Sequence, residues 1–200
     1  LVYFHGSGGR GNDNMSQLTD AGAIGAFFDQ QISKNHCCYI LAAQVPENEK
    51  WVNVPWEDLS HKMPKISKSM GLLFEILDNI TENKDYLIDN NRIYALGISM
   101  GGFGVWDAIQ RRRKFFAAAI PICGGGDSSI CSRISSMPIW SWHGTNDQDI
   151  SVQRSRDMHN GILNAGGNPK YTEVKERGHD VWLDVWGKKS VWDWLFSKSL

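Results

Sequence analysis

The chain has 200 residues, a formal net charge of −1, 42% hydrophobic residues and 22% charged residues. This length and composition predict one globular domain over residues 1–200 and argue against wholesale disorder. The basic residues are scattered except at residues 111–114, and this run is too short for a phosphate-binding stripe, so no nucleic-acid partner is expected. No apolar run reaches the roughly 18 residues that cross a bilayer, so no membrane span is expected.

Cysteine usage argues against a disulfide scaffold and against a metal site. Four cysteines are too few for a disulfide-rich fold, although Cys123 and Cys131 could pair across a glycine-rich loop or remain free thiols. No Cys or His spacing resembles a zinc site, so no metal is expected. The first six residues lack the basic start and the cleavage site of a signal peptide, which leaves the compartment open between cytoplasm and secretion.

Short apolar runs alternate with helical patterns along the chain. This alternation predicts βα units, and therefore an α/β fold with a mainly parallel central sheet covered by helices on both faces. The expected strands, in chain order, are residues 1–4, 39–45, 92–98, 117–123, 138–143 and 171–175.

Helices are expected between these strands. Apolar residues recur at helical spacing from Ile66 to Ile80, and a second helical pattern over residues 151–165 ends at two glycines that suit a C-cap. Residues 190–196 predict a short terminal helix. Residues 46–64 show no regular pattern and are expected to lie over the sheet edge or the functional site.

A glycine-rich loop follows the first expected strand. Residues 5–11 read His-Gly-Ser-Gly-Gly-Arg-Gly, which matches neither a P-loop nor a dinucleotide fingerprint. Glycines let the main chain turn its N–H groups toward a developing negative charge. The backbone N–H of Ser7, with Gly8 as the alternative, is therefore the expected loop donor of an oxyanion hole.

A nucleophile elbow is predicted where the strand over residues 92–98 ends. Residues 97–101 read Gly-Ile-Ser-Met-Gly, directly after that strand and directly before a helical pattern. Such a turn needs small residues on both sides of the serine, because the backbone bends sharply from strand to helix. Ser99 is therefore the expected nucleophile, and the Met100 N–H at the helix start is the second expected oxyanion donor. A structural serine in a glycine-rich turn is the alternative.

A serine nucleophile needs a base and a group that orients the base. His179 lies in a loop after the last expected strand and is the expected base. Asp147 follows the strand over residues 138–143, and the order Ser, Asp, His is that of α/β-hydrolases. Asp149 is the alternative third member, and Asp127 is a weaker one.

Taken together, these segments resemble the esterases and predicted peptidases related to polyhydroxybutyrate depolymerases and feruloyl esterases, a branch of the α/β-hydrolases. The matching stretches cover most of the chain in order and are residues 4–14, 91–106, 121–127, 143–147 and 178–180. The resemblance implies an eight-stranded sheet, a triad of Ser99, Asp147 and His179, ester substrates and no cofactor. Members usually have further strands before the segment that matches residues 1–4, and we expect the sheet of this chain to lack them. Arg10 departs from the acidic residue expected in this loop.

The expected activity is hydrolysis of a carboxylic ester through an acyl-enzyme, on short-chain acyl esters or on carbohydrate-linked esters of the acetyl or feruloyl type. Trp56, Trp106 and Trp182 are expected to border an open cleft, where indole rings could stack on a substrate. Two other functions stay open, namely a serine peptidase or amidase of the same fold and a non-catalytic binding module. A missing triad residue would favour the binding module, and none is missing.

Overall fold

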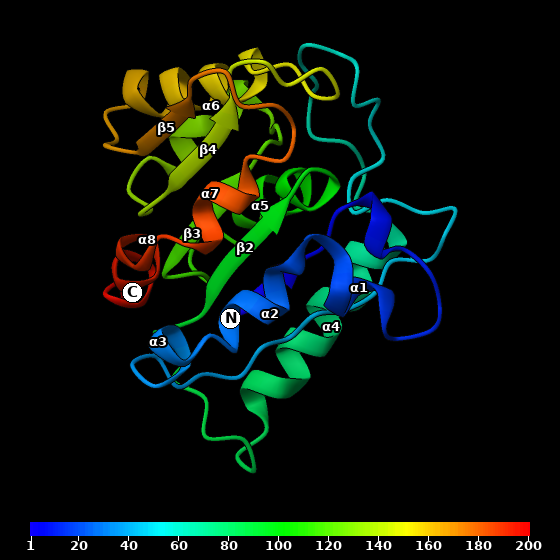
Figure 1. The fold of residues 1–200 in the computed structure, drawn as a ribbon, viewed down its shortest axis with the longest axis vertical. Helices are drawn as coiled ribbons and strands as arrows, with labels where there is room; N and C mark the ends of the chain where they lie inside the picture. Colours follow the sequence, from blue (N-terminus) through cyan, green and yellow to red (C-terminus); the bar gives the residue numbers. More distant parts are fainter.

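The centre of the molecule is a five-stranded parallel sheet in the order β1-β2-β3-β4-β5 (Figure 1). The computed structural model describes the backbone of residues 1–200 and every side chain except those of residues 30 and 31. Since all strands run in one direction, the loops that follow them meet at one edge of the sheet. The strands are β1 Val2–Phe4, β2 Tyr94–Ile98, β3 Ala118–Ile122, β4 Trp140–Gly144 and β5 Lys170–Val174.

Helices cover both faces of this sheet (Figure 1). Among the described residues, no helix has both the length and the apolar character that crossing a bilayer requires. The α-helices are α1 Ser16–Thr19, α2 Ala23–Phe27, α3 Gln30–Ser33, α4 Lys68–Glu82, α5 Met100–Arg111, α6 Gln153–Asn164, α7 Trp182–Trp186 and α8 Lys189–Phe196. Three 3-10 turns add η1 Ser7–Gly9, η2 Asp20–Gly22 and η3 Ser128–Ile134.

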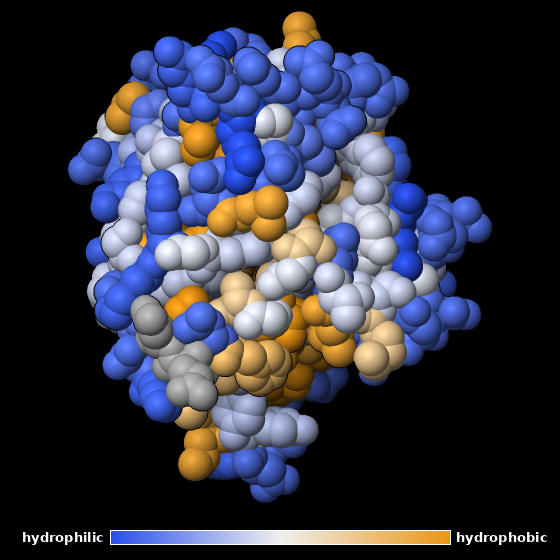
Figure 2. All heavy atoms as spheres, viewed as in Figure 1, coloured by the Kyte–Doolittle hydropathy of each residue, from blue (hydrophilic) through white to orange (hydrophobic). Residues whose placement is uncertain are grey.

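Two apolar cores lie on opposite faces of the sheet, because successive strand side chains point to opposite sides. In β1, Phe4 packs into the core shared with α4, α5 and α6, while Tyr3 packs into the core shared with α2, α7 and α8. The central strands β2 and β3 are buried on both sides, which explains their nearly continuous apolar sequence, whereas the edge strand β5 is partly exposed. On the outer surface, hydrophilic residues dominate over α6 and β5, while apolar residues gather in the lower middle of the face shown in Figure 2.

Capping residues determine where α4 begins and where α6 ends. The Ser67 hydroxyl accepts the Met70 N–H at 3.0 Å and caps α4, whose buried side includes Leu73 and Leu77. Each such buried side chain contributes about 2 kcal/mol to folding. Helix α6 ends where Gly166 adopts a φ of 80°, which confirms the predicted glycine C-cap.

Residues 39–45 do not form the expected sixth strand. Only Leu41 bridges to Val2, with the Tyr3 N–H donating to Leu41 O at 2.8 Å. Further along, the Val45 N–H donates to the His5 side chain at 3.0 Å, and Val45 O accepts the Gly11 N–H. The segment leaves the sheet because these partners take its backbone groups. The prediction was therefore wrong here, and the described chain forms five strands where the resemblance implied eight.

The irregular insertion over residues 46–64 lies against α5 and reaches toward α6 (Figure 1). The Trp51 indole N–H donates to His5 O at 3.1 Å, which ties the insertion to the end of β1. The Arg154 guanidinium donates to Pro55 O at 3.1 Å and to His61 Nδ1 at 2.6 Å, which ties it to α6. The insertion is thus held beside the edge where the strands end.

Candidate active site

Ser99 lies at a sharp turn between β2 and α5. Its φ of 52° and ψ of −121° are rare for a residue with a side chain, and are the kind of strain that persists where the surroundings enforce it. A Cβ on Gly101 would overlap Phe4 O, and a Cβ on Gly102 would overlap Ile122 O. The glycines are therefore required by the close approach of α5 to β1 and β3, as in a nucleophile elbow.

The structure brings Ser99, His179 and Asp147 together from the ends of three different strands. His179 Nε2 lies 2.8 Å from Ser99 Oγ, and His179 Nδ1 lies 2.8 Å from Asp147 Oδ2. A carboxylate can only accept, so the Nδ1 atom carries the proton in this pair. The Nε2 lone pair then faces the serine hydroxyl, which is the arrangement that a general base requires.

The Asp147 carboxylate is buried and accepts several hydrogen bonds. Its Oδ1 accepts the N–H groups of Asp149 at 3.0 Å and Ile150 at 2.9 Å. Burial alone would raise the pKa of Asp147, but hydrogen bonds from His143, His179 and the Ile150 N–H outweigh burial and hold its pKa below the usual range. Asp147 therefore stays charged at neutral pH.

The two alternative carboxylates lie in other environments. Asp149 is exposed, and only its backbone N–H contacts Asp147. Asp127 accepts the N–H groups of Met63 and Ser129, which ties the insertion to η3. Asp147 is thus the carboxylate that the structure places against His179.

His143 is a residue of this site that the sequence reasoning missed. It is fully buried at the end of β4, with Nε2 at 3.1 Å from Asp147 Oδ2 and 3.0 Å from Ile150 O. Both partners are acceptors, so Nε2 carries the proton, while Nδ1 lies 2.7 Å from Ser155 Oγ. The available signal in the sequence was a His-Gly pair at the end of the expected strand over residues 138–143.

The glycine-rich loop after β1 folds into the turn η1 beside the elbow. A Cβ on Gly101 would also crowd the His5 carbonyl, which shows how closely the loop and the elbow approach. Arg10, which stands where the resemblance led us to expect an acidic residue, donates from Nε to Ser7 O at 3.1 Å and so braces the turn. Among the hydrogen bonds of the described residues, none uses the N–H of Ser7 or of Met100.

Of the three tryptophans expected around the cleft, the structure places Trp182 beside the triad. Its ring meets the His179 ring edge-on, with centroids 5.4 Å apart. Trp56 is partly buried under the Lys50 ammonium, which lies 4.3 Å from its ring centroid. Trp106 is 0% exposed within the core between α5 and the sheet. The prediction that Trp106 borders the cleft was therefore wrong, because its α5 position faces inward.

Cys123 adds a third kind of donor atom next to Asp147 and His179, within 4.8 Å of both. Burial, and then the negative charge of Asp147, raise the pKa of the Cys123 thiol well above its usual value. A metal would need the thiolate, and it would compete with the hydrogen bonds that already occupy Asp147 and His179. This donor set fits a hydrogen-bonded triad better than a metal centre.

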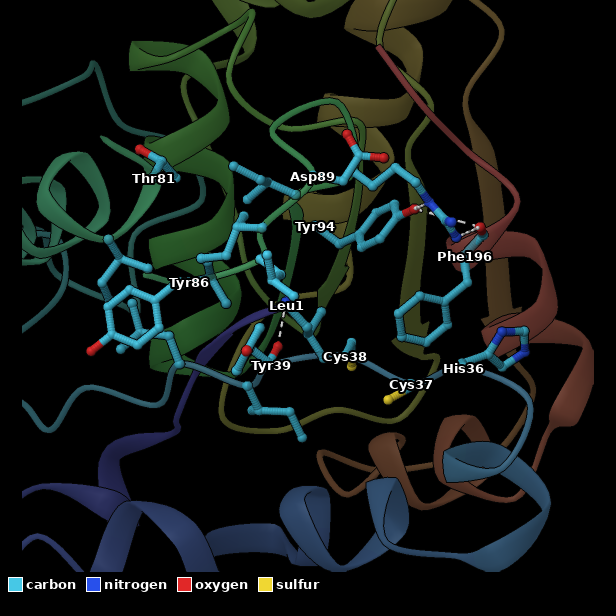
Figure 3. A pocket seen from close by; sticks show the side chains of 18 of the residues that line it. Leu1, His36, Cys37, Cys38, Tyr39, Thr81, Tyr86, Asp89, Tyr94 and Phe196 are labelled. Carbon is cyan, nitrogen blue, oxygen red and sulfur yellow. Dashed lines mark hydrogen bonds between the residues drawn. The ribbon is translucent and has the colours of Figure 1, made fainter. Parts of the chain in front are cut away.

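A cavity of about 780 Å³ lies at the other end of the sheet, where β1 and β2 begin (Figure 3). Leu1, Tyr39, Tyr86 and Phe196 contribute to its largely apolar wall. No triad residue lines it, so this cavity is separate from the site at the carboxyl ends of the strands.

Known proteins with this architecture include several esterases, although no family model matches the chain. A thermostable esterase of known structure superposes with a TM-score of 0.90 at 35% identity, covering 100% of this chain and 54% of the esterase. Arabidopsis thaliana SOBER1 superposes over 97% of this chain and 95% of its own at 18% identity, with a TM-score of 0.70.

A bifunctional acetylxylan esterase/xylanase, XynS20E from Neocallimastix patriciarum, is 32% identical over 88 residues, which are 44% of this chain and 13% of that protein. The chain therefore spans about half the length of the thermostable esterase and a small part of the bifunctional enzyme. The parallel sheet, the elbow and the superposition on the 35% identical esterase confirm the predicted α/β-hydrolase fold.

Proposed function

We propose that the protein is a serine hydrolase that cleaves carboxylic esters through an acyl-enzyme. The observation that carries the proposal is the continuous relay from Ser99 Oγ through both nitrogens of His179 to Asp147, with 2.8 Å at each contact. Nucleophile, base and orienting carboxylate need this order and these distances for acyl transfer.

In the first step, Ser99 Oγ attacks the ester carbonyl while His179 Nε2 takes the hydroxyl proton. The carbonyl oxygen becomes an oxyanion, which accepts hydrogen bonds from the N–H groups of Met100 and Ser7. The intermediate then expels the alcohol, which takes the proton from His179, and the acyl group stays on Ser99. Water repeats the sequence on the acyl-enzyme and releases the carboxylic acid.

Asp147 serves this cycle as a fixed negative charge. Its depressed pKa keeps it ionised, so it stabilises the imidazolium of His179 without taking the proton itself. The bond to Nδ1 also keeps the ring in the tautomer that leaves Nε2 free to act as a base.

The substrates that we propose are short-chain acyl esters or carbohydrate-linked esters of the acetyl or feruloyl type. This class agrees with a position in the polyhydroxybutyrate depolymerase and feruloyl esterase branch, and with the acetylxylan esterase name of the 32% identical relative. The Trp182 ring beside His179 offers an aromatic surface for a sugar or a feruloyl ring. We also propose that residues 1–200 act as one hydrolase domain, since both cores share one sheet.

The test is labelling with a fluorophosphonate probe beside hydrolysis of p-nitrophenyl acetate. The wild type is expected to label and to turn over, whereas Ser99→Ala does neither. The control is Ser135→Ala, which removes a serine hydroxyl that donates to Ser132 O and plays no part in the candidate site. This variant should behave like the wild type. A folded wild type that neither labels nor hydrolyses would overturn the proposal in favour of a binding module.

A further inference from the structure

Asp20 reaches the glycine-rich loop from the turn η2. Its Oδ2 accepts the Gly6 N–H at 2.9 Å, and a Cβ on Gly8 would lie only 2.7 Å from its Oδ1. The carboxylate therefore lies directly against the loop and contacts both glycines that flank Ser7. No part of the proposed reaction so far uses this side chain.

The turn that carries Asp20 is itself held in place. Ala21 and Gly22 both adopt positive φ values, 56° and 71°, which bend the chain between α1 and α2. The Trp186 indole N–H donates to Ala21 O at 2.8 Å. Trp186 ends α7, the helix that follows His179, so Asp20 is fixed against elements on both sides of the site.

These contacts decide which loop N–H groups are free. The Gly6 N–H is bound to Asp20, and the Gly9 N–H donates to Gly6 O at 3.2 Å. The N–H groups between them, on Ser7 and Gly8, have no acceptor among the hydrogen bonds of the described residues. A charged acceptor binds an N–H about twice as strongly as a neutral one, so the carboxylate is a firm anchor for this turn.

We propose that Asp20 is a positioning residue that orients the loop after β1 so that its free N–H groups point at the oxyanion. This inference rests on the proposed function. It also runs against simple electrostatics, because a carboxylate near a developing oxyanion repels it. If repulsion outweighed positioning, removing the charge of Asp20 would speed the reaction.

The experiment compares Asp20→Ala and Asp20→Asn with the wild type and with Asp107→Asn. Asp107 is a buried carboxylate that pairs with Arg111 inside α5 and outside the site, whereas Asp20 is partly buried, so the Asp107 variant reports the general cost of neutralising a carboxylate that is shielded from solvent. Three quantities are measured: kcat and KM for p-nitrophenyl acetate, inhibition by an alkyl trifluoromethyl ketone, and hydrogen exchange of residues 5–10. The ketone forms a tetrahedral adduct whose oxyanion needs the same N–H donors as the reaction.

Asp20→Ala is expected to lower kcat by about tenfold or more, since losing one oxyanion donor outright costs 100- to 1,000-fold. Its KM should change little, and its affinity for the trifluoromethyl ketone should fall by the same factor as kcat/KM, while the matched methyl ketone binds as before. Asp20→Asn keeps one acceptor oxygen, so its kcat and its affinity for the trifluoromethyl ketone should lie between those of the wild type and those of Asp20→Ala. Residues 5–10 should exchange faster in Asp20→Ala and not in Asp107→Asn.

Unchanged kinetics in both Asp20 variants, a rate increase in Asp20→Asn, or equal weakening of both ketones would overturn the inference. The last result would mean that Asp20 supports the fold rather than the oxyanion donors. If Asp20→Ala does not fold, Asp20→Asn carries the same comparison. A wild type without esterase activity overturns the proposed function together with this inference, whereas an active wild type with indifferent Asp20 variants overturns this inference alone.

Discussion

Asp147 Oδ2 contacts two histidine rings, and only one of them reaches the nucleophile. Asp147→Asn would present an amide that can donate to His179 Nδ1 and so favour the wrong tautomer. We expect kcat to fall about 10,000-fold, as for the same change in other triads. Asp149→Asn, two residues away and exposed, should leave kcat within about twofold, because surface substitutions are usually mild. Steady-state kinetics on p-nitrophenyl acetate compare the two variants. An equal fall of kcat in both would contradict the assignment of Asp147 as the carboxylate that orients His179.

The second ring, His143, is expected to act on the reaction only through Asp147. His143→Phe fills a similar space but removes the N–H that Asp147 accepts, and it leaves the Ser155 hydroxyl without its ring partner. We expect unfolding to become easier by about 2–3 kcal/mol, the usual cost of an unsatisfied buried group. Asp147 also loses one of the hydrogen bonds that hold its carboxylate against His179, so kcat should fall while KM for p-nitrophenyl acetate changes little. Urea unfolding and steady-state kinetics test the two expectations, and an unchanged kcat would mean that His143 serves stability alone.

The sequence was sufficient to predict which residues come together at the candidate site when each is tied to a local turn and to chain order. Ser99 is predicted by the five-residue elbow pattern, and Asp147 and His179 by their loops after later strands, and the structure places the three side chains in contact. His143 and Asp20 could not be derived in this way, since their partners lie across the fold and no local pattern marks them. The prediction that Trp106 borders the cleft was wrong for a related reason. The sequence alone does not show whether a tryptophan on a helix faces the core or the surface, and Trp106 is buried.

At the level of elements, the contact between α5 and the sheet depends on glycines without side chains. Gly102→Ala would place a methyl group onto Ile122 O, a backbone atom that cannot yield without moving β3. We expect a loss of about 2–3 kcal/mol in unfolding free energy, in the range of overpacked cores. Gly71→Ala in α4 is the matched control: nothing lies within 4 Å of its Cβ, and alanine should stabilise the helix by about 0.5–1 kcal/mol. Thermal melts of both variants should shift in opposite directions, and a stable Gly102→Ala protein would contradict the close approach.

Five of the six expected strands formed. Strands β1 to β4 are largely apolar and buried, so a covered sheet satisfies them, while β5 is the partly exposed edge strand. Residues 39–45 have an equally apolar sequence, yet His5 and Gly11 bind the backbone of Val45 and draw the segment away. Helices α1 to α3 and α7 are five residues or shorter. Such short helices have too few turns to show a periodic pattern, and tertiary packing forms them.

The stability of the whole molecule in acid is expected to depend on two histidines, one buried and one partly buried, that stay neutral in the fold. His5 donates from Nδ1 to Gly6 O at 2.6 Å and accepts the Val45 N–H at Nε2, so a second proton would set two donors against each other. His61 accepts from the Arg154 guanidinium at Nδ1, and a charged ring would face a cation. These two rings join the loop after β1, the segment before the insertion, and α6.

Stability is therefore expected to fall as the solution becomes acidic. Burial first, with Arg10 adding to it against the Gly6 carbonyl, lowers the pKa of His5 from 6.5 to about 4. Burial and then Arg154 lower the pKa of His61 from 6.5 to about 4. Between pH 6.5 and 4 these two histidines are protonated in the unfolded chain but remain neutral in the folded chain. The free energy of unfolding therefore falls as the pH falls through this window.

The slope of this effect can be measured and assigned to a residue. Each histidine that is protonated only in the unfolded chain lowers the free energy of unfolding by about 1.4 kcal/mol per pH unit inside the window. The effect is smaller for the partly exposed His61, because solvent screens its charge. Urea unfolding of the wild type at several pH values between 7 and 4 should show the decline, and His61→Gln should flatten it while retaining an acceptor for Arg154. The raised pKa values of Asp20 and Asp107, both due first to burial, act in the opposite direction. A wild type equally stable at pH 6.5 and pH 4, or a His61→Gln variant with the wild-type slope, would show that the neutral histidines do not control the acid limit of the fold.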